Sequence, residues 1–200
     1  MKRLYKSLIT VIIITLICLG CRERLQPRPR GYFRIDLPEK EYTSFNSECS
    51  FSFEYPAYGV LTDSDEPDAE PCWFNIEFEK YRAKIHISYK AIEGNLPSLL
   101  EDTYTLTYNH TIKADAIRET PFVNDEDDVY GLLYDLRGNT ATAVQFYLTD
   151  SINHFLRGSL YFFASPNEDS LSPVISYFRE DIIHLIETTR WKETGKNDLR

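Results

Sequence analysis

The chain has 200 residues, with 31 acidic and 22 basic side chains and a formal net charge of −9. This acidic balance argues against nucleic acid as a partner and against a broad electrostatic footprint on anionic lipid. The length suits one well-buried domain rather than two, and the many aromatic residues supply both a core and material for a protein-binding face.

Residues 1–20 have the pattern of a bacterial signal peptide. Lys2, Arg3 and Lys6 precede an uncharged run over residues 8–19. As a helix, about a dozen residues span roughly 18 Å, which is well short of a ~30 Å hydrocarbon core. We therefore expect this segment to be cleaved rather than to span a membrane.

The residues around the expected cleavage point resemble a lipobox, in which a small residue precedes the Cys that is acylated and becomes the N-terminus. Here Gly20 precedes Cys21, while Cys18 stands where Leu is usual. Cys18 cannot be the acylated residue, because Ile17 is too large for the position before it. We expect acylated Cys21 to hold the protein on a lipid membrane, since each buried CH₂ contributes ~0.8 kcal/mol; a simple secreted protein is the alternative.

The chain after Cys21 divides into three parts. Residues 21–30 form a Pro/Arg-rich tether, in which Pro27 and Pro29 favour an extended course. Residues 31–192 are expected to form a single domain, and residues 193–200 a polar C-terminal tail.

Cys49 and Cys72 are an even pair in an oxidising compartment, which makes them disulfide candidates. Neither belongs to a Cys-x-x-Cys motif and no His lies near them in the sequence, so no metal site is expected. A bridge requires that the flanking strands do not pair as a simple hairpin, or that Cys72 folds back along its loop. The alternative is a hairpin with two free thiols.

The expected elements run in the order strands, helices, strands, helix. Strands are predicted at residues 31–38, 49–55, 74–78 and 84–89, helices at 96–108 and 110–118, and three consecutive strands at 129–136, 140–148 and 154–163. The last helix is expected to begin at a cap on Asp169 or Ser172, with Pro173 in its first turn, and to end at Trp191. Its apolar stripe comprises Ile175, Phe178, Ile182, Leu185 and Ile186. This order predicts an α+β fold, an antiparallel β-sheet with helices packed on its faces.

The sequence offers no catalytic or metal-binding motif, so we expect no enzyme, no cofactor and no metal. Each of the four histidines stands alone, and His86 is expected to be exposed. Asp150, Ser151 and His154 suggest a hydrolytic triad, but a turn explains the Asp and Ser and no nucleophile-elbow pattern is present. The acidic segment 63–70 lacks the pattern of an EF-hand and is expected to be a solvated loop.

Three stretches together resemble the gliding motility lipoprotein GldD family of Bacteroidetes. They are residues 28–38, with Pro-Arg-Gly-Tyr-Phe-Arg; residues 49–56; and residues 145–174, with Phe-Leu-Arg-Gly. The strand and helix order is also similar to the PsbP-type α/β sandwich, a looser likeness that implies nothing about photosynthesis.

The resemblance implies a periplasm-facing lipoprotein that is a non-enzymatic component of the gliding motility and type IX secretion machinery. Its partners would be other envelope proteins of that machinery, with the membrane leaflet and the oligomeric state left open. The alternative is a lipoprotein that binds a small ligand or cell-envelope glycan. Arg157, Asp150 and Asn167 belong to the most recognisable segment and are the partner-surface candidates, because an Arg within an apolar strand needs either an ion pair or a recognition role. The alternative is that Arg157 simply stands on the solvated face of the strand.

Overall fold

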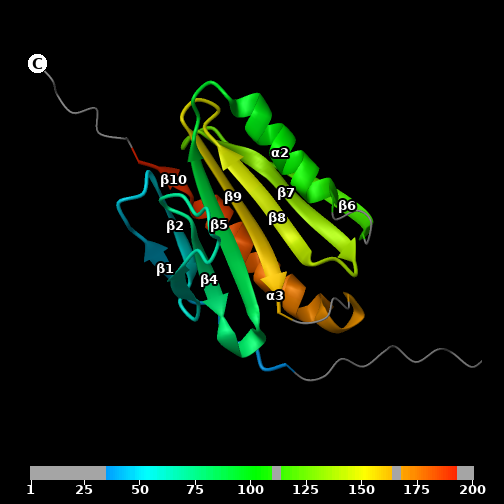
Figure 1. Ribbon diagram of the computed structural model, residues 1–200. Helices are drawn as coiled ribbons and strands as arrows, with labels where there is room; N and C mark the ends of the chain where they lie inside the picture. The colour runs from blue at the N-terminus through cyan, green and yellow to red at the C-terminus, as the bar shows by residue number, and fades with distance from the viewer. Residues whose placement is uncertain (1–34, 110–113, 164–167, 193–200) are drawn as a thin grey trace, which may run out of the picture. The chain divides into compact units, whose positions relative to one another are not determined.

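The computed structural model describes residues 35–109, 114–163 and 168–192 (Figure 1). The chain divides into two units, Met1–Phe33 and Arg34–Arg200. The predictions for the signal peptide, Cys21, the tether, Asn167 and the C-terminal tail lie outside the described residues. Within those residues, no helix is long and apolar enough to cross a membrane.

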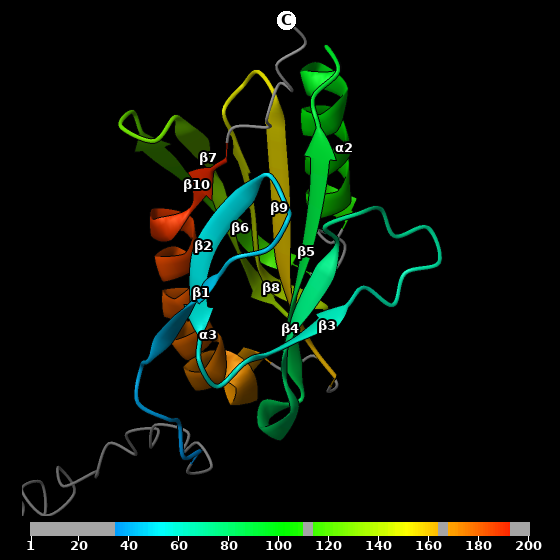
Figure 2. The ribbon, with the colours of Figure 1, turned by 90° about the vertical axis from the view of Figure 1, so that its left-hand side faces the viewer.

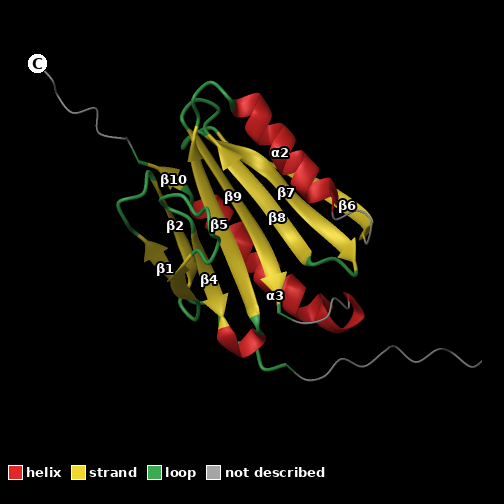
Figure 3. Ribbon diagram, in the orientation of Figure 1, coloured by secondary structure: helices red, strands yellow, loops and turns green. Residues whose placement is uncertain are grey.

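Seven antiparallel strands form the main sheet (Figure 3). They are β3 (Val60–Asp63), β4 (Phe74–Phe78), β5 (Ala83–Ala91), β6 (Ala114–Asn124), β7 (Val129–Gly138), β8 (Thr142–Thr149) and β9 (His154–Phe162). Their spatial order is β3-β4-β5-β9-β8-β7-β6, so the three predicted consecutive strands β7, β8 and β9 form the expected meander. Gly138, whose φ is 101°, supplies the turn between β7 and β8.

A smaller sheet and two α-helices complete the fold. The small sheet has the order β1-β2-β10, with β1 at Tyr42–Phe45, β2 at Phe51–Pro56 and β10 at Arg190–Trp191. The helices are α2 (Leu96–Asn109) and α3 (Glu168–Thr188), and a 3₁₀ turn, η1, covers Glu79–Tyr81. Helix α3 and the small sheet lie on one side of the main sheet and α2 lies on the other (Figure 2). The predicted α+β fold is confirmed.

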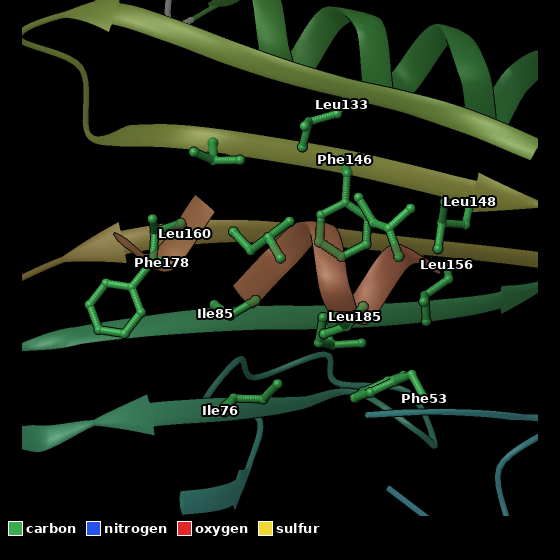
Figure 4. Close-up of a cluster of buried hydrophobic side chains, with 14 of the residues drawn as sticks. Phe53, Ile76, Ile85, Leu133, Phe146, Leu148, Leu156, Leu160, Phe178 and Leu185 are labelled. Carbon is green, nitrogen blue, oxygen red and sulfur yellow. The ribbon is translucent and has the colours of Figure 1, made fainter. Parts of the chain in front are cut away.

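The core lies between α3, the small sheet and one face of the main sheet. Alternate residues of the strands point into it, among them Ile85 and Leu160, which have no exposed surface. Helix α3 meets this face with a buried stripe at helical spacing: Val174, Phe178, Ile182, Leu185 and Ile186. Figure 4 shows Phe178 and Leu185 of this stripe among the core side chains of the sheet. The stripe follows the prediction, except that Val174 is buried and Ile175 is only partly buried.

Helix α2 is attached more weakly. Its buried residues are Leu99, Thr103 and Thr107, a stripe with one large apolar side chain. Leu106 and Tyr104 on the same helix are exposed. Because small polar side chains bury little apolar surface, α2 contributes far less hydrophobic stabilisation than α3.

The structure joins Cys49 to Cys72 in a disulfide, with a Cα–Cα distance of 5.8 Å. The geometric condition for a bridge is met because β2 and β4 belong to different sheets and do not pair with each other. Phe51 and Phe74, which open these strands, face each other across the core with ring centroids 6.4 Å apart. The bridge therefore fastens the small sheet to the start of β4 in the large one.

A buried carboxylate fastens the start of the described chain to α3. Asp181 has no exposed surface and accepts hydrogen bonds from Lys40 Nζ (2.7 Å), Tyr42 Oη (3.1 Å) and Tyr58 Oη. Lys40 Nζ also lies 3.4 Å from the centroid of the Tyr177 ring. Since the buried charge is both paired and hydrogen-bonded, the cost of burying it is offset.

A second polar link joins α3 to β7. Arg179 Nε lies 2.5 Å from Asp135 Oδ1, and Arg118 Nη2 lies 2.7 Å from Asp135 Oδ2. Although burial alone raises the pKa of Asp135, the hydrogen bonds from the two guanidinium groups hold that pKa below its usual value of 3.8.

The predicted helix over residues 110–118 is wrong where the structure describes it. From Ala114 onward these residues belong to β6, which pairs with β7 along almost its whole length. An isolated helix this short is marginal in water, whereas the strand gains a hydrogen-bonded ladder. Pro121 is tolerated within β6 because the strand lies at the edge of the sheet.

The ends of the chain also differ from the prediction. Residues 35–38 are not in a strand, and the first strand of the described chain is β1. Helix α3 begins at Glu168, before either predicted cap, so Pro173 lies inside it. The helix ends at Thr188, and Trp191 pairs with Phe51 in β10 instead of ending the helix.

Candidate functional site

A cavity of about 350 Å³ lies between α2 and the face of the main sheet that points away from the core. Trp73 and Phe155 form its wall on the sheet side, and Leu99 and Leu106 contribute from α2. Arg157 brings a positive charge to the lining. Cavities of this size with apolar walls and a few polar groups are typical small-molecule sites.

Strand alternation places Arg157 in this cavity. In β9, Leu156, Gly158 and Leu160 point to the core, so Arg157 points to the opposite face, beneath α2. Its Nη2 donates a hydrogen bond to Gln145 Oε1 (3.0 Å). Its Nε is buried and has no hydrogen-bond partner among the described residues.

The electrostatic position of Arg157 is unusual. Among the described residues, no carboxylate forms an ion pair with its largely buried guanidinium, although Glu66 is near enough to act on it electrostatically. Burial lowers the pKa of Arg157, but an arginine side chain still remains protonated in a protein. A buried charge without a counter-charge is costly, and proteins normally pair such a charge.

A short hydrogen-bonded chain orients Gln145, the partner of Arg157. Gln145 is 1 % exposed; its Oε1 also accepts from Thr107 Oγ1 (3.2 Å), and its Nε2 donates to Thr142 Oγ1 (2.7 Å). Thr107 belongs to the buried stripe of α2, so the same network links the helix to the floor of the cavity.

Gly158 follows Arg157 for a packing reason on the other face of the strand. A Cβ atom at Gly158 would lie 2.2 Å from Cε1 of Phe146, whose ring is 1 % exposed. The absent side chain lets the ring lie directly against the β9 backbone. Arg157 therefore faces the cavity on one side of the sheet, and Gly158 faces the core on the other side.

The acidic loop after β3 is solvent-exposed, as predicted, and it also contacts this same face of the sheet. Three of its carboxylates contact basic side chains of β5: Asp65 with Lys84 (2.9 Å), Glu66 with His86 (3.6 Å) and Glu70 with Lys90 (2.6 Å). The expectation that His86 is exposed is wrong, because its side chain is 13 % exposed and its Nδ1 bonds to Asn75 Oδ1. Burial lowers the pKa of His86, which favours the neutral ring.

Trp73 is held rigidly at the wall of the cavity. It follows disulfide-bonded Cys72, whose φ is 67°, and its Nε1 donates to the Tyr89 carbonyl oxygen (2.8 Å). Lys90 Nζ lies 5.6 Å from the indole centroid, within cation–π range. The ring therefore presents a fixed apolar surface.

The predicted partner-surface residues have different surroundings. Arg157 lines the cavity, whereas Asp150 lies in the turn between β8 and β9. Asp150 Oδ1 accepts hydrogen bonds from the backbone N–H groups of Ile152, Asn153 and His154. Although burial raises the pKa of Asp150, these bonds lower it below its usual value. Its carboxylate therefore builds the turn, in agreement with the turn explanation of the Asp150-Ser151 pair.

Sequence reasoning did not identify the apolar wall of the cavity. Trp73 follows a Cys in a loop, and nothing in that pattern places it beside Phe155, more than eighty residues away in the chain.

Among the described residues, no cluster of three or more His, Cys, Asp or Glu side chains could hold a metal ion.

Two comparisons with known proteins give matches. The family model described as gliding motility lipoprotein GldD matches residues 22–191. The solution structure of cyanobacterial PsbP (CyanoP) from Synechocystis sp. PCC 6803 is similar, with a TM-score of 0.47 and 11% identity over 80% of this chain and 97% of that one. No curated protein sequence matches the chain.

Proposed function

The chain belongs to the gliding motility lipoprotein GldD family, and from this premise we propose that it is a lipid-anchored, non-enzymatic component of the gliding motility and type IX secretion machinery, facing the periplasm. The observation that carries the proposal is the family match, which extends over nearly all of the chain that follows Cys21. The lipobox supports the lipid anchor, and the use of the Asp150 carboxylate to build its own turn supports a non-enzymatic role.

The anchor is tested by a Cys21→Ala variant expressed in the native host. We expect this variant to leave the membrane fraction or to remain an uncleaved precursor, and to incorporate no labelled palmitate, because the acylated sulfur is gone. Cys18→Ala is the matched control and should stay lipidated. Palmitate in the Cys21→Ala variant would refute the assignment.

The role in the machinery is tested by deleting the gene and by isolating the lipidated protein from native membranes with its partners. The deletion should stop gliding, or in a non-gliding host the export of type IX cargo, and only a lipidated copy should restore it. Normal motility and normal export in the deletion strain would contradict the proposal.

A second candidate function is supported by the cavity under α2. An aromatic wall with convergent polar groups is what binding of a small ligand or cell-envelope glycan requires. Titration of a lipidated Trp191→Phe variant with such ligands, in which the remaining tryptophan fluorescence comes from Trp73, tests this function.

A further inference from the structure

We propose that the cavity between α2 and the sheet binds a ligand that carries an oxyanion, a carboxylate or a phosphate, on a ring-shaped or apolar body, with Arg157 as the residue that holds the oxyanion. The inference rests on the second candidate function and names the chemistry of its ligand. It does not depend on the role in motility.

The first argument is the charge balance on this face of the sheet. Lys84 and Lys90 of β5 each have a carboxylate partner from the acidic loop, at 2.9 Å and 2.6 Å. Among the described cations that line the cavity, Arg157 is the one without a directly paired carboxylate, and Glu66 acts on it only at longer range. An external oxyanion would supply the missing counter-charge.

The second argument is the unused hydrogen-bonding capacity of the guanidinium. One Nη donates to Gln145, and the buried Nε has no partner among the described residues. A planar guanidinium binds carboxylate or phosphate through two parallel N–H donors, and such charge-assisted pairs are both strong and geometrically specific. Because Gln145 fixes one end of the group, the orientation of the rest is set before a ligand arrives.

The third argument is the remainder of the lining. Trp73 and Phe155 offer apolar surface on one side, and Leu99 does so on the other. Asp102 of α2 also lines the cavity and would repel a purely anionic ligand, so it favours one that also offers a hydroxyl or ammonium donor. A sugar acid or an amino-acid derivative has these features, and a bare inorganic ion has only one of them.

Access to the cavity follows from the weak attachment of α2. With Leu99 as the only large apolar residue in the buried stripe of the described helix, a small displacement of α2 costs little hydrophobic burial. Thr107 connects this helix to Gln145 and hence to Arg157 (Thr107 Oγ1 to Gln145 Oε1, 3.2 Å). Occupancy of the cavity would therefore order α2.

The test is a titration of the lipidated protein in detergent micelles, observed through the Arg157 Nε–H resonance and by calorimetry. The probes are glucuronate, phenylacetate and inorganic phosphate, with glucose and benzyl alcohol as neutral counterparts. We expect an oxyanion probe to shift the Arg157 resonance and its neutral counterpart to leave that resonance unchanged. Binding of phosphate alone would assign the site to phosphorylated ligands, and binding of glucuronate or phenylacetate would assign it to carboxylates.

The variants separate a binding role from a structural one. Arg157→Met should weaken oxyanion binding by at least about tenfold, because charge-assisted hydrogen bonds are lost. It should leave the unliganded protein as stable as before or more stable, since a buried unpaired charge is removed while Gln145 keeps its bonds to Thr107 and Thr142. Lys84→Met, which removes a cation already paired with Asp65, is the matched control and should bind as the unmodified protein does.

Several results would overturn the inference. One is the absence of binding by every oxyanion probe, and another is equal binding by the Arg157→Met variant. A third is a large loss of stability in that variant, which would make Arg157 a structural residue. Binding of a neutral sugar alone would refute the oxyanion and still leave the ligand-binding function in place, so the two failures are distinguishable.

Discussion

Substitution of Gly158 by Ala tests the packing of the β9 backbone against Phe146. The added Cβ would lie 2.2 Å from Cε1 and 2.3 Å from Cζ of that ring. The ring must move by more than about 1 Å, judged from an ordinary contact of about 3.5 Å, and it is 1 % exposed. Overpacking of this kind costs about 1–3 kcal/mol, and we expect the upper end because backbone and ring are both confined.

A loss of about 3 kcal/mol in the free energy of unfolding corresponds to a fall in Tm of about 6–12 °C for a domain of this size. The measurement is thermal and denaturant unfolding followed by circular dichroism, under oxidising conditions. Phe146→Leu alone should cost about 1–2 kcal/mol, since the substitution leaves a partly filled cavity. The double variant should be more stable than the sum of the two losses predicts, by about 1–2 kcal/mol, because Leu leaves room for the new methyl group.

Gly94→Ala is the control for the backbone alone. Gly94 has a φ of +74°, and no atom lies within 4 Å of the position that an added Cβ would take. Ala should therefore cost about 1 kcal/mol from conformational strain without a clash. A Gly158→Ala variant within about 0.5 kcal/mol of the unmodified protein, or strictly additive losses in the double variant, would refute the packing argument.

Three further predictions concern stability. Replacing Cys49 and Cys72 by Ser should lower the free energy of unfolding by about 3.4 kcal/mol on the chain-entropy model for a sequence separation of 23, which denaturant unfolding measures. Asp135→Asn should flatten the acid side of the stability profile, below about pH 4, because the depressed pKa of Asp135 gives stability that is present above pH 3.8 and lost as the pH falls through the lowered value. Burial lowers the pKa of His154 and His86 below 6.5, so stability should be complete above that pH and decline below it, with a shallower slope in His154→Gln.

Each of these predictions has a contradicting result. Unchanged stability after reduction of the native protein would show that the disulfide does not contribute to the free energy of unfolding. An acid profile that is the same in Asp135→Asn as in the unmodified protein would show that its guanidinium partners do not depress its pKa. A His154→Gln variant with an undiminished slope between about pH 7 and 5 would assign that slope to other groups.

The sequence predicts the elements whose periodicity agrees with their tertiary packing. The alternation around Phe51 and Phe53 in β2, the helical spacing of Phe178 and Ile182 in α3, and the meander from β7 to β9 all follow from local pattern. Pairing between strands that are far apart in the sequence does not follow from local pattern. The sequence of β6 shows only a weak strand pattern. These residues form a strand because they pair with β7, and that pairing cannot be predicted from the local sequence alone.

Of the candidate site, only Arg157 could be predicted from the sequence. An Arg inside an apolar strand identifies Arg157, since that residue type is rarely buried without a reason. The cavity itself depends on how far α2 stands off the sheet, which is set by the size of Thr103 and Thr107 against their neighbours. Depth of packing between a helix and a sheet is a property of both surfaces together, so neither sequence segment carries it alone.

The attachments along the start of the described chain also decide how the domain responds to a pull from its N-terminal side. The Asp36 carbonyl oxygen is held by exposed bonds from Lys80 and Tyr81, whereas Lys40 is held by the fully buried Asp181. For a protein tethered to a membrane, tension would strain the exposed bonds first and reach the buried one last. If the protein carries the proposed lipid anchor, we expect a pull on the chain before Asp36 to break these exposed bonds before it disturbs the buried contacts of Asp181.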